Sequence, residues 1–170
     1  MDERQPKDVR AKLYTDIAHA LLDSKLVAYV DRYNNQFAHL DEEKVLRYPC
    51  ALIEFSDIQW EQIGRHAQRG TVLVNLYIAT KVRGRTAAVG QTVDPAVEDF
   101  ELLSALRIVL RDLRLDYAGT FTRKRSVTDH DHDSTIVNLE QYAVTVADTS
   151  AEPGTRRVSV SVEIGDVSIK

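Results

Sequence analysis

Residues 129–133, with the sequence Asp-His-Asp-His-Asp, are the densest group of potential metal ligands in the chain, since imidazoles and carboxylates both bind divalent transition metals. In an extended segment, His130 and His132 would point to one side and the three aspartates to the other. A catalytic zinc takes about three protein ligands, so this pair would need a further donor, for which His66 and His39 are candidates. The alternative is a solvated hairpin tip, where Asp tolerates turn geometry. We expect this segment to be a solvated hairpin tip. If metal does bind there, we expect a weak structural or intersubunit site.

No catalytic site is predicted elsewhere in the sequence. A G-x-S-x-G elbow is absent, and Gly84 and Gly90 fit neither the P-loop nor the dinucleotide-binding pattern. Cys50, the single cysteine, stands at the start of an apolar run, which is typical of a small buried hydrophobe rather than a nucleophile. His19 lies within a predicted helix, beside its apolar stripe. We therefore expect a protein that is not an enzyme and has no cofactor.

Clusters of basic residues could instead contact another protein through electrostatic matching. The candidates are Arg83 and Arg85 in a loop, and Arg123, Lys124 and Arg125 in a polar strand. We expect Arg123 and Arg125 to share one exposed face of that strand. A solvated surface is the alternative. Nucleic acid is a weaker option, because no aromatic residues interleave with the charges and the net charge is −4.

The end of the chain contains a strand-like segment after a Pro-Gly break at residues 153–154. One face of this segment is apolar, and its members alternate with polar residues: Val158, Val160, Val162 and Ile164. An apolar edge strand promotes association unless it is covered. The segment therefore either folds back on its own sheet or adds to the sheet of a neighbour, which makes its apolar residues candidates for an interface.

The composition is that of an ordinary globular domain. The chain has 170 residues, 44% of them hydrophobic and 28% charged, which corresponds to about one domain. One cysteine excludes a disulfide scaffold. No run approaches the ~20 apolar residues of a membrane span, and the N-terminus lacks the apolar region of a secretory signal. We expect a soluble intracellular protein that does not bind a membrane.

Hydrophobic periodicity predicts the elements that would position these residues. Two amphipathic helices are expected, at residues 8–23 and 95–113. The second carries a stripe that includes Phe100, Leu103, Leu106, Leu110 and Leu113. A loop with a short helical turn is expected at 42–46. Strands are expected at 26–33, 49–60, 71–82, 121–128 and 136–146, with Val82 on the apolar face of the third strand, which should be central in its sheet. The last two strands should form a long hairpin.

This order predicts an α+β fold: a mostly antiparallel sheet with two helices packed on one face, a long hairpin and an extra C-terminal strand. Residues 1–150 are expected to form a single domain, and residues 151–170 a C-terminal extension with a β-strand.

The order of elements resembles that of phage tail-terminator (tail-completion, or minor tail) proteins, particularly the small type found in prophage-like tail gene clusters. The resemblance covers roughly residues 10–148 and lies in the pattern of elements. It rests on four parts: the helix at 13–22, the strand pair at 48–55 and 70–78, the helix after Asp94, and the hairpin from residues 129–133 to Leu139, Tyr142 and Val144.

The resemblance implies a structural function for the domain at residues 1–150. Such proteins form a ring, commonly a hexamer, that caps the head-proximal end of the tail tube and joins it to the head or neck. The implied partners are other copies of the chain, the tail tube protein, and a head–tail connector or neck protein. DNA would pass the lumen without specific binding. The implied location is the virion tail, assembled in the cytoplasm of a bacterial host.

Three alternatives stay open from the sequence. One is a head–tail joining (neck) protein of the same assembly. Another, from a different class, is a small metal-dependent enzyme that uses the His/Asp segment at 129–133. A third is a protein-binding module of another pathway.

Overall fold

The computed structural model describes residues 8–39, 46–82, 94–129 and 135–151. The elements follow in this order: α1 (Val9–Asp23), β1 (Tyr29–Arg32), the 3-10 helix η1 (Gln36–His39), β2 (Cys50–Gln62), β3 (Gln68–Lys81), α2 (Asp94–Asp112), β4 (Thr122–Asp129) and β5 (Thr135–Asp148). The five strands form one sheet in the order β1-β2-β3-β5-β4. Neighbours are antiparallel except β1 and β2, which are parallel. The predicted α+β fold with a mostly antiparallel sheet is confirmed.

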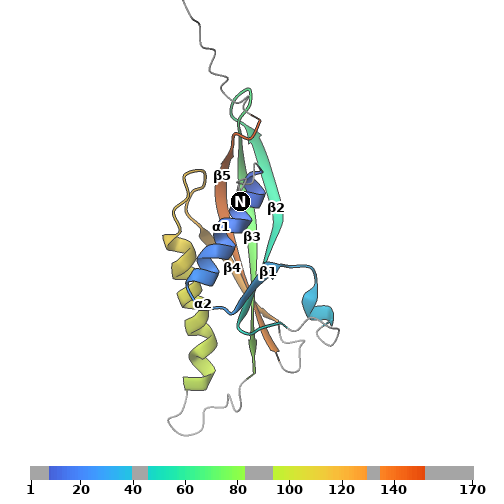
Figure 1. Cartoon of the computed structure of the whole chain (residues 1–170), viewed down its shortest axis with the longest axis vertical. Helices are drawn as coiled ribbons and strands as arrows, with labels where there is room; N and C mark the ends of the chain where they lie inside the picture. Colours follow the sequence, from blue (N-terminus) through green and yellow to red (C-terminus); the bar gives the residue numbers. More distant parts are fainter. Residues whose placement is uncertain (1–7, 40–45, 83–93, 130–134, 152–170) are drawn as a thin grey trace, which may run out of the picture.

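Both helices lie on the same face of the sheet (Figure 1). From α1, every fourth residue is buried in the main core: Val9, Leu13, Ile17 and Leu21. The Asp8 carboxylate caps this helix, because its Oδ1 accepts a hydrogen bond from the Arg10 backbone N–H at 2.8 Å. From α2, the residues buried in the same core are Leu103, Leu106 and Leu110. The two apolar stripes thus pack on one shared sheet surface, as predicted.

The prediction that Phe100 belongs to the buried stripe of α2 is wrong. Its side chain is 66% exposed, although Leu103, one turn later, is buried. The helix-facing residues of β4 beside this turn include Arg123 and Ser126, which are polar and leave a cavity of about 320 Å³. Because that strand offers little apolar surface, the ring of Phe100 stays at the rim.

The strand β3 is central, as predicted, and its helix-facing side chains are buried: Val72, Val74, Leu76 and Ile78. Val82, expected on the same face, is 44% exposed because β3 ends at Lys81. The helix-facing residues of β5, among them Tyr142 and Val144, complete this core. The predicted hairpin of β4 and β5 is confirmed by their antiparallel pairing.

A second, smaller core covers the other face of the sheet near β1. Its buried members are Phe37, Leu46, Cys50, Leu52, Ala79 and Val137. The rings of Tyr33 and Tyr77 stack beside it, with their centroids 4.0 Å apart. The helical turn expected at 42–46 falls mostly outside the described residues, while η1 forms just before it. No helix in the described part of the chain is long and apolar enough to cross a membrane.

Candidate functional site at the sheet edges

The two edges of the sheet differ in chemistry, and the first is the basic strand β4. It pairs with β5 on one side only, and nearly all of its residues are exposed. The pairing shifts at Lys124, so that Arg123 lies opposite Tyr142 while Arg125 lies opposite Gln141. Tyr142 and Gln141 are adjacent in β5 and face opposite sides of the sheet. The prediction that Arg123 and Arg125 share one face is therefore wrong, because a β-bulge adds one residue between them.

Arg123 faces the helices and forms an ion pair with Glu140. Its Nη1 lies 3.3 Å from Oε2 of Glu140, whose side chain is only 3% exposed, against 39% for Arg123. Arg107 of α2 lines the same cavity. A buried carboxylate is costly unless it is paired. The main role of Arg123 is therefore to pair with the buried carboxylate of Glu140. The exposed Lys124 and Arg125 are the better candidates for contact with a partner.

These features protect the β4 edge against indiscriminate strand pairing. Lysine and arginine side chains along an edge, together with a bulge that distorts it, are common means by which soluble proteins prevent edge-to-edge association. The three basic residues of β4 and the irregularity at Lys124 fit this pattern. A partner would therefore meet β4 as a charged surface rather than as a regular strand.

The opposite edge is open over most of the length of β2. The short strand β1 pairs only with Cys50 to Ile53, and the Tyr33 backbone N–H donates the last hydrogen bond, to the Ile53 carbonyl at 2.9 Å. Beyond that point β2 continues to Gln62, and no strand of the described chain pairs with the outer side of residues 54–62. These residues present backbone donors and acceptors that another strand could use.

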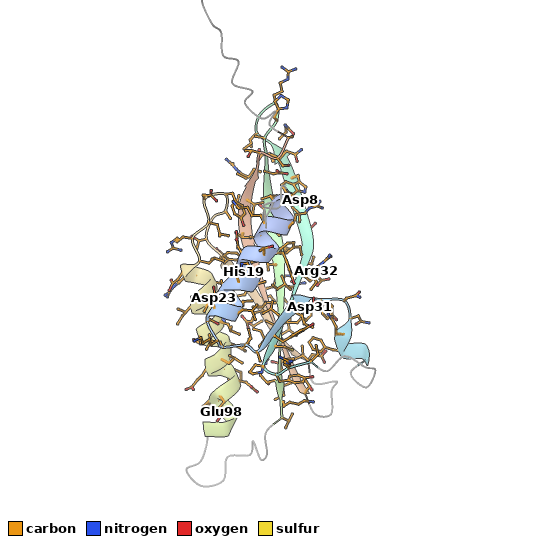
Figure 2. The ribbon with its side chains drawn as sticks, in the orientation of Figure 1. Asp8, His19, Asp23, Asp31, Arg32 and Glu98 are labelled. Carbon is orange, nitrogen blue, oxygen red and sulfur yellow. The ribbon has the colours of Figure 1, made fainter. Side chains whose placement is uncertain are left out.

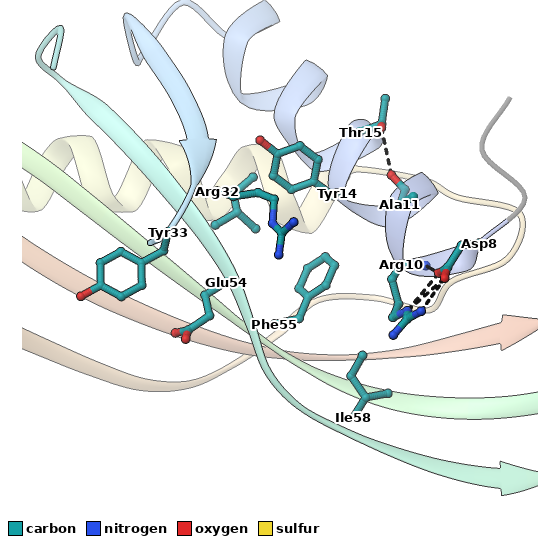
Figure 3. A pocket seen from close by; sticks show the side chains of 11 residues that line it. Asp8, Arg10, Ala11, Tyr14, Thr15, Arg32, Tyr33, Glu54, Phe55 and Ile58 are labelled. Carbon is teal, nitrogen blue, oxygen red and sulfur yellow. Dashed lines mark hydrogen bonds and ion pairs between the residues drawn. The ribbon is translucent and has the colours of Figure 1, made fainter. Parts of the chain in front are cut away.

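A groove runs between this open edge and the start of α1 (Figure 3). It has a volume of about 680 Å³, and its walls include Arg10 and Tyr14 of α1 and Arg32 at the end of β1. Phe55 and Ile58 point from β2 into it. Both are only partly buried, although they pack against the main core. The helix-facing side of the open edge is thus apolar and incompletely covered.

Trp60 continues this apolar row toward the end of β2. It lies opposite Gly70 of β3, and its side chain is 40% exposed. A Cβ atom at position 70 would come within 2.7 Å of the Trp60 ring, so only glycine lets the ring lie this close to the strand. The indole therefore rests on the backbone of β3 with its outer side open.

The other side of the open edge is acidic. Asp57 and Glu61 are exposed there and face away from the helices, since they lie opposite Leu73 and Arg69 of β3. Glu54 lies nearer the second core, where its Oε2 accepts hydrogen bonds from Asn75 Nδ2 at 3.0 Å and from the Tyr77 hydroxyl at 2.9 Å. Only Asp57 and Glu61 are thus available to a partner as negative charges.

Several predicted site residues lie outside the described residues: Arg83, Arg85, His130, His132, Val158, Val160, Val162 and Ile164. Within the described part of the chain, no three His, Cys, Asp or Glu side chains gather closely enough to hold a metal ion. Cys50 has no exposed surface, and burial raises the pKa of its thiol to about 11, which confirms the prediction of a buried hydrophobe. His19 is exposed on α1 (Figure 2).

The open edge of β2 and the buried Glu140 were not predicted from the sequence. Alternation of side chains indicated the strand and its two faces, but it carries no information on how far a neighbouring strand extends. Glu140 stands between Asn138 and Tyr142 on the predicted buried side of its strand, in a row that continues with Val144 and Val146. A carboxylate in that row was the one signal that could have identified it. A scan against models of protein families found no match for this chain, and neither did a search of curated proteins.

Proposed function

We propose that the protein is a structural subunit of a homo-oligomeric ring, of the kind that caps the head-proximal end of a phage-like tail tube. The observation that carries the proposal is the open edge of β2 at residues 54–62, which has a groove containing the partly covered Phe55 and Ile58 on one side and carboxylates on the other. This edge is irregular at Ser56, where the pairing with β3 shifts, and continuous from Asp57 to Gln62. An unpaired edge of this length is a template for strand addition. A soluble protein that keeps one is suited to subunit contact.

The chemical difference between the two edges supports a head-to-tail arrangement. One edge carries Lys124 and Arg125, and the other carries Asp57 and Glu61. Contact between two identical edges would bring like charges together, whereas contact between different edges pairs opposite charges. Repeated head-to-tail contacts make a closed ring when the rotation between subunits closes, and a filament when it does not. The proposed ring is the closed case.

The sheet face opposite the helices supports the passage of DNA through such a ring. Its upper half, near the β2–β3 turn, carries exposed residues of mixed character, among them Gln59, Glu61, Arg69, Thr71 and Thr145. Dense cation clusters neutralise phosphate and hold nucleic acid. A surface that combines small hydroxyls with scattered charges of both signs suits a lumen that lets DNA slide. In this proposal, the two rims of the ring contact the tail tube protein and a head–tail connector.

The proposal is tested by measuring the mass of the assembly in solution and imaging it by negative stain, with and without tail tubes. We expect rings, with the hexamer as the first candidate, that cap one end of each tube and stop its growth. A protein that stays monomeric in both conditions would refute the proposal. Selective binding to a portal-side protein, with tubes ignored, would move the function to the neck of the same assembly.

A pair of charge-reversal variants tests whether the open edge of β2 makes the contact between subunits. Asp57→Lys places a cation on the open edge and should weaken assembly through repulsion from the basic edge of the neighbour. Asp23→Lys makes the same change at the end of α1, away from β2 (Figure 2), and should assemble as the unmodified protein does. Equal behaviour of the two variants would show that the β2 edge is not the contact.

A further inference from the structure

The open edge of β2 lacks a partner strand in the described chain, while the sequence holds a strand-like segment outside it. We propose that residues 158–164 of a neighbouring copy add to this edge as an extra strand. The inference rests on the proposed oligomer and specifies its interface. It assigns a role to the C-terminal extension expected at residues 151–170.

The lengths of the two segments match. Residues 158–164 in extended form span roughly 23 Å, and the nine residues 54–62 span roughly 30 Å, at about 3.3 Å per residue. The added strand therefore fits within the edge, with most of its length along Asp57 to Gln62, beyond the irregularity at Ser56. Its main-chain groups would pair with β2, and its alternate side chains would fall into or away from the groove, as in other cases of strand addition.

The two faces of the segment also match the two sides of the edge. If Val160 and Val162 face the helices, they meet the partly covered row formed by Phe55, Ile58 and Trp60. Adding this strand would cover the groove with aliphatic surface and remove the outer side of the indole from water. Burial of apolar surface of this kind is the main favourable contribution to association.

That orientation turns the odd-numbered residues of the segment toward the acidic side of the edge. Arg157 would then share a face with Asp57 and Glu61 of the neighbouring copy. The residues that follow on this face, Ser159 and Ser161, are small enough to lie beside the carboxylates. One orientation therefore satisfies both the apolar and the charged side of β2, apart from Glu163 at the far end of the segment.

The topology favours a neighbouring copy over the same chain as the donor. Within one chain, β5 ends at Asp148, opposite Gln68 of β3, and β3 separates β5 from β2. The segment would have to pass the β2–β3 turn and then double back along the outer side of β2. In a head-to-tail neighbour, the sheet order places β5 next to the edge strand β4. Residues 117–119 lie beside the last residues of β5 on that side. The C-terminal segment of the neighbour therefore leaves its sheet close to the basic edge, which in a head-to-tail contact faces the open edge of β2.

The first experiment uses Trp60, the single tryptophan of the chain, as a reporter in the full-length protein. The double variant Val160→Lys with Val162→Lys should shift its emission to the red and increase its quenching by acrylamide. It should also weaken association at least about tenfold, since one buried valine already contributes that much. The matched variant Ser159→Lys with Ser161→Lys adds the same charge to the other face and should resemble the unmodified protein. Identical emission in all three proteins would overturn the inference.

The second experiment identifies the donor chain by mixing two populations under oxidising conditions. One population carries a cysteine in place of Asp57, Gln59 or Glu61, and the other carries Ser161→Cys. A disulfide between the two populations supports the inference, because a bond within one chain cannot join them. If cysteines at both positions of one chain instead link only within that chain, the donor is the chain itself and the inference is overturned.

The same samples test the proposed ring separately from the added strand. Rings that form without any response of Trp60 or any disulfide would refute the added strand and leave the ring intact. Persistent monomers would refute both. The native Cys50 has no exposed surface and does not compete in the cross-linking.

Discussion

Replacing Arg123 with methionine tests whether this arginine stabilises the folded protein through its ion pair with Glu140 or acts only at the surface. Methionine keeps much of the length and apolar character of the side chain but removes the charge. In the structure, Arg123 is the one residue of the described chain that forms an ion pair with Glu140, at 3.3 Å. The variant would leave a carboxylate with a 3% exposed side chain facing the helices without that partner. We expect a clear loss of stability.

The size of the loss follows from the burial of the two partners. Breaking a fully buried pair by removing one partner costs about 3–5 kcal/mol. Here Arg123 is 39% exposed, so water already screens part of the interaction. Arg107 lines the same cavity and can compensate for part of the lost charge. We therefore expect the free energy of unfolding to fall by about 2 kcal/mol, below the fully buried range.

A matched substitution and a double variant separate this explanation from a general effect on β4. Arg125→Met makes the same chemical change two residues away, on the opposite face of the sheet, and should cost no more than about 0.5 kcal/mol. Glu140→Gln added to Arg123→Met removes the unpaired charge and should restore most of the loss.

Urea unfolding at one fixed protein concentration, followed by circular dichroism, measures all of these differences. The concentration must be held constant, because association of folded subunits adds to apparent stability. Equal losses for Arg123→Met and Arg125→Met would refute the internal role of Arg123. So would a double variant that is no more stable than Arg123→Met alone.

Three further predictions concern other parts of the fold. Gly70→Val should cost about 1–3 kcal/mol through overpacking and change the emission of Trp60, whose ring would meet the new Cβ at 2.7 Å; unchanged emission would contradict this contact. The Cys50 thiol, buried with a pKa of about 11, should react with a thiol reagent only after unfolding, and fast reaction of the folded protein would contradict its burial. A hydrogen bond to Asp31 raises the pKa of Tyr29 to about 12, and burial does the same for Tyr77 and Tyr142. Because the folded state favours the neutral phenols, their contribution to stability is complete below the ordinary pKa of 10.0 and is lost as pH rises toward about 12. Tyrosinate absorbance recorded together with circular dichroism checks this, and full ionisation near the ordinary pKa without unfolding would contradict it.

Side-chain periodicity alone was enough to predict most elements of the fold. The four-residue spacing of Val9, Leu13, Ile17 and Leu21 predicted α1 and its buried face, and the alternation along β3 predicted a central strand. These predictions succeed because amphipathic spacing reports directly which side of an element is removed from water. The tertiary structure was needed to show where that spacing fails, as at Phe100, which lies beside a polar strand.

The features that define the candidate site depend on contacts between segments far apart in the chain. The parallel pairing of β1 with β2 ends at Ile53, which leaves residues 54–62 open, and nothing local to β2 signals where its neighbour stops. The bulge at Lys124 sends Arg123 and Arg125 to opposite faces, because one extra residue inverts the alternation. Local spacing of apolar residues in the sequence was enough to predict most of the strands and helices. Only the tertiary structure decided which edges stay open and which charges turn inward, because pairing register and strand overlap are set by long-range contacts.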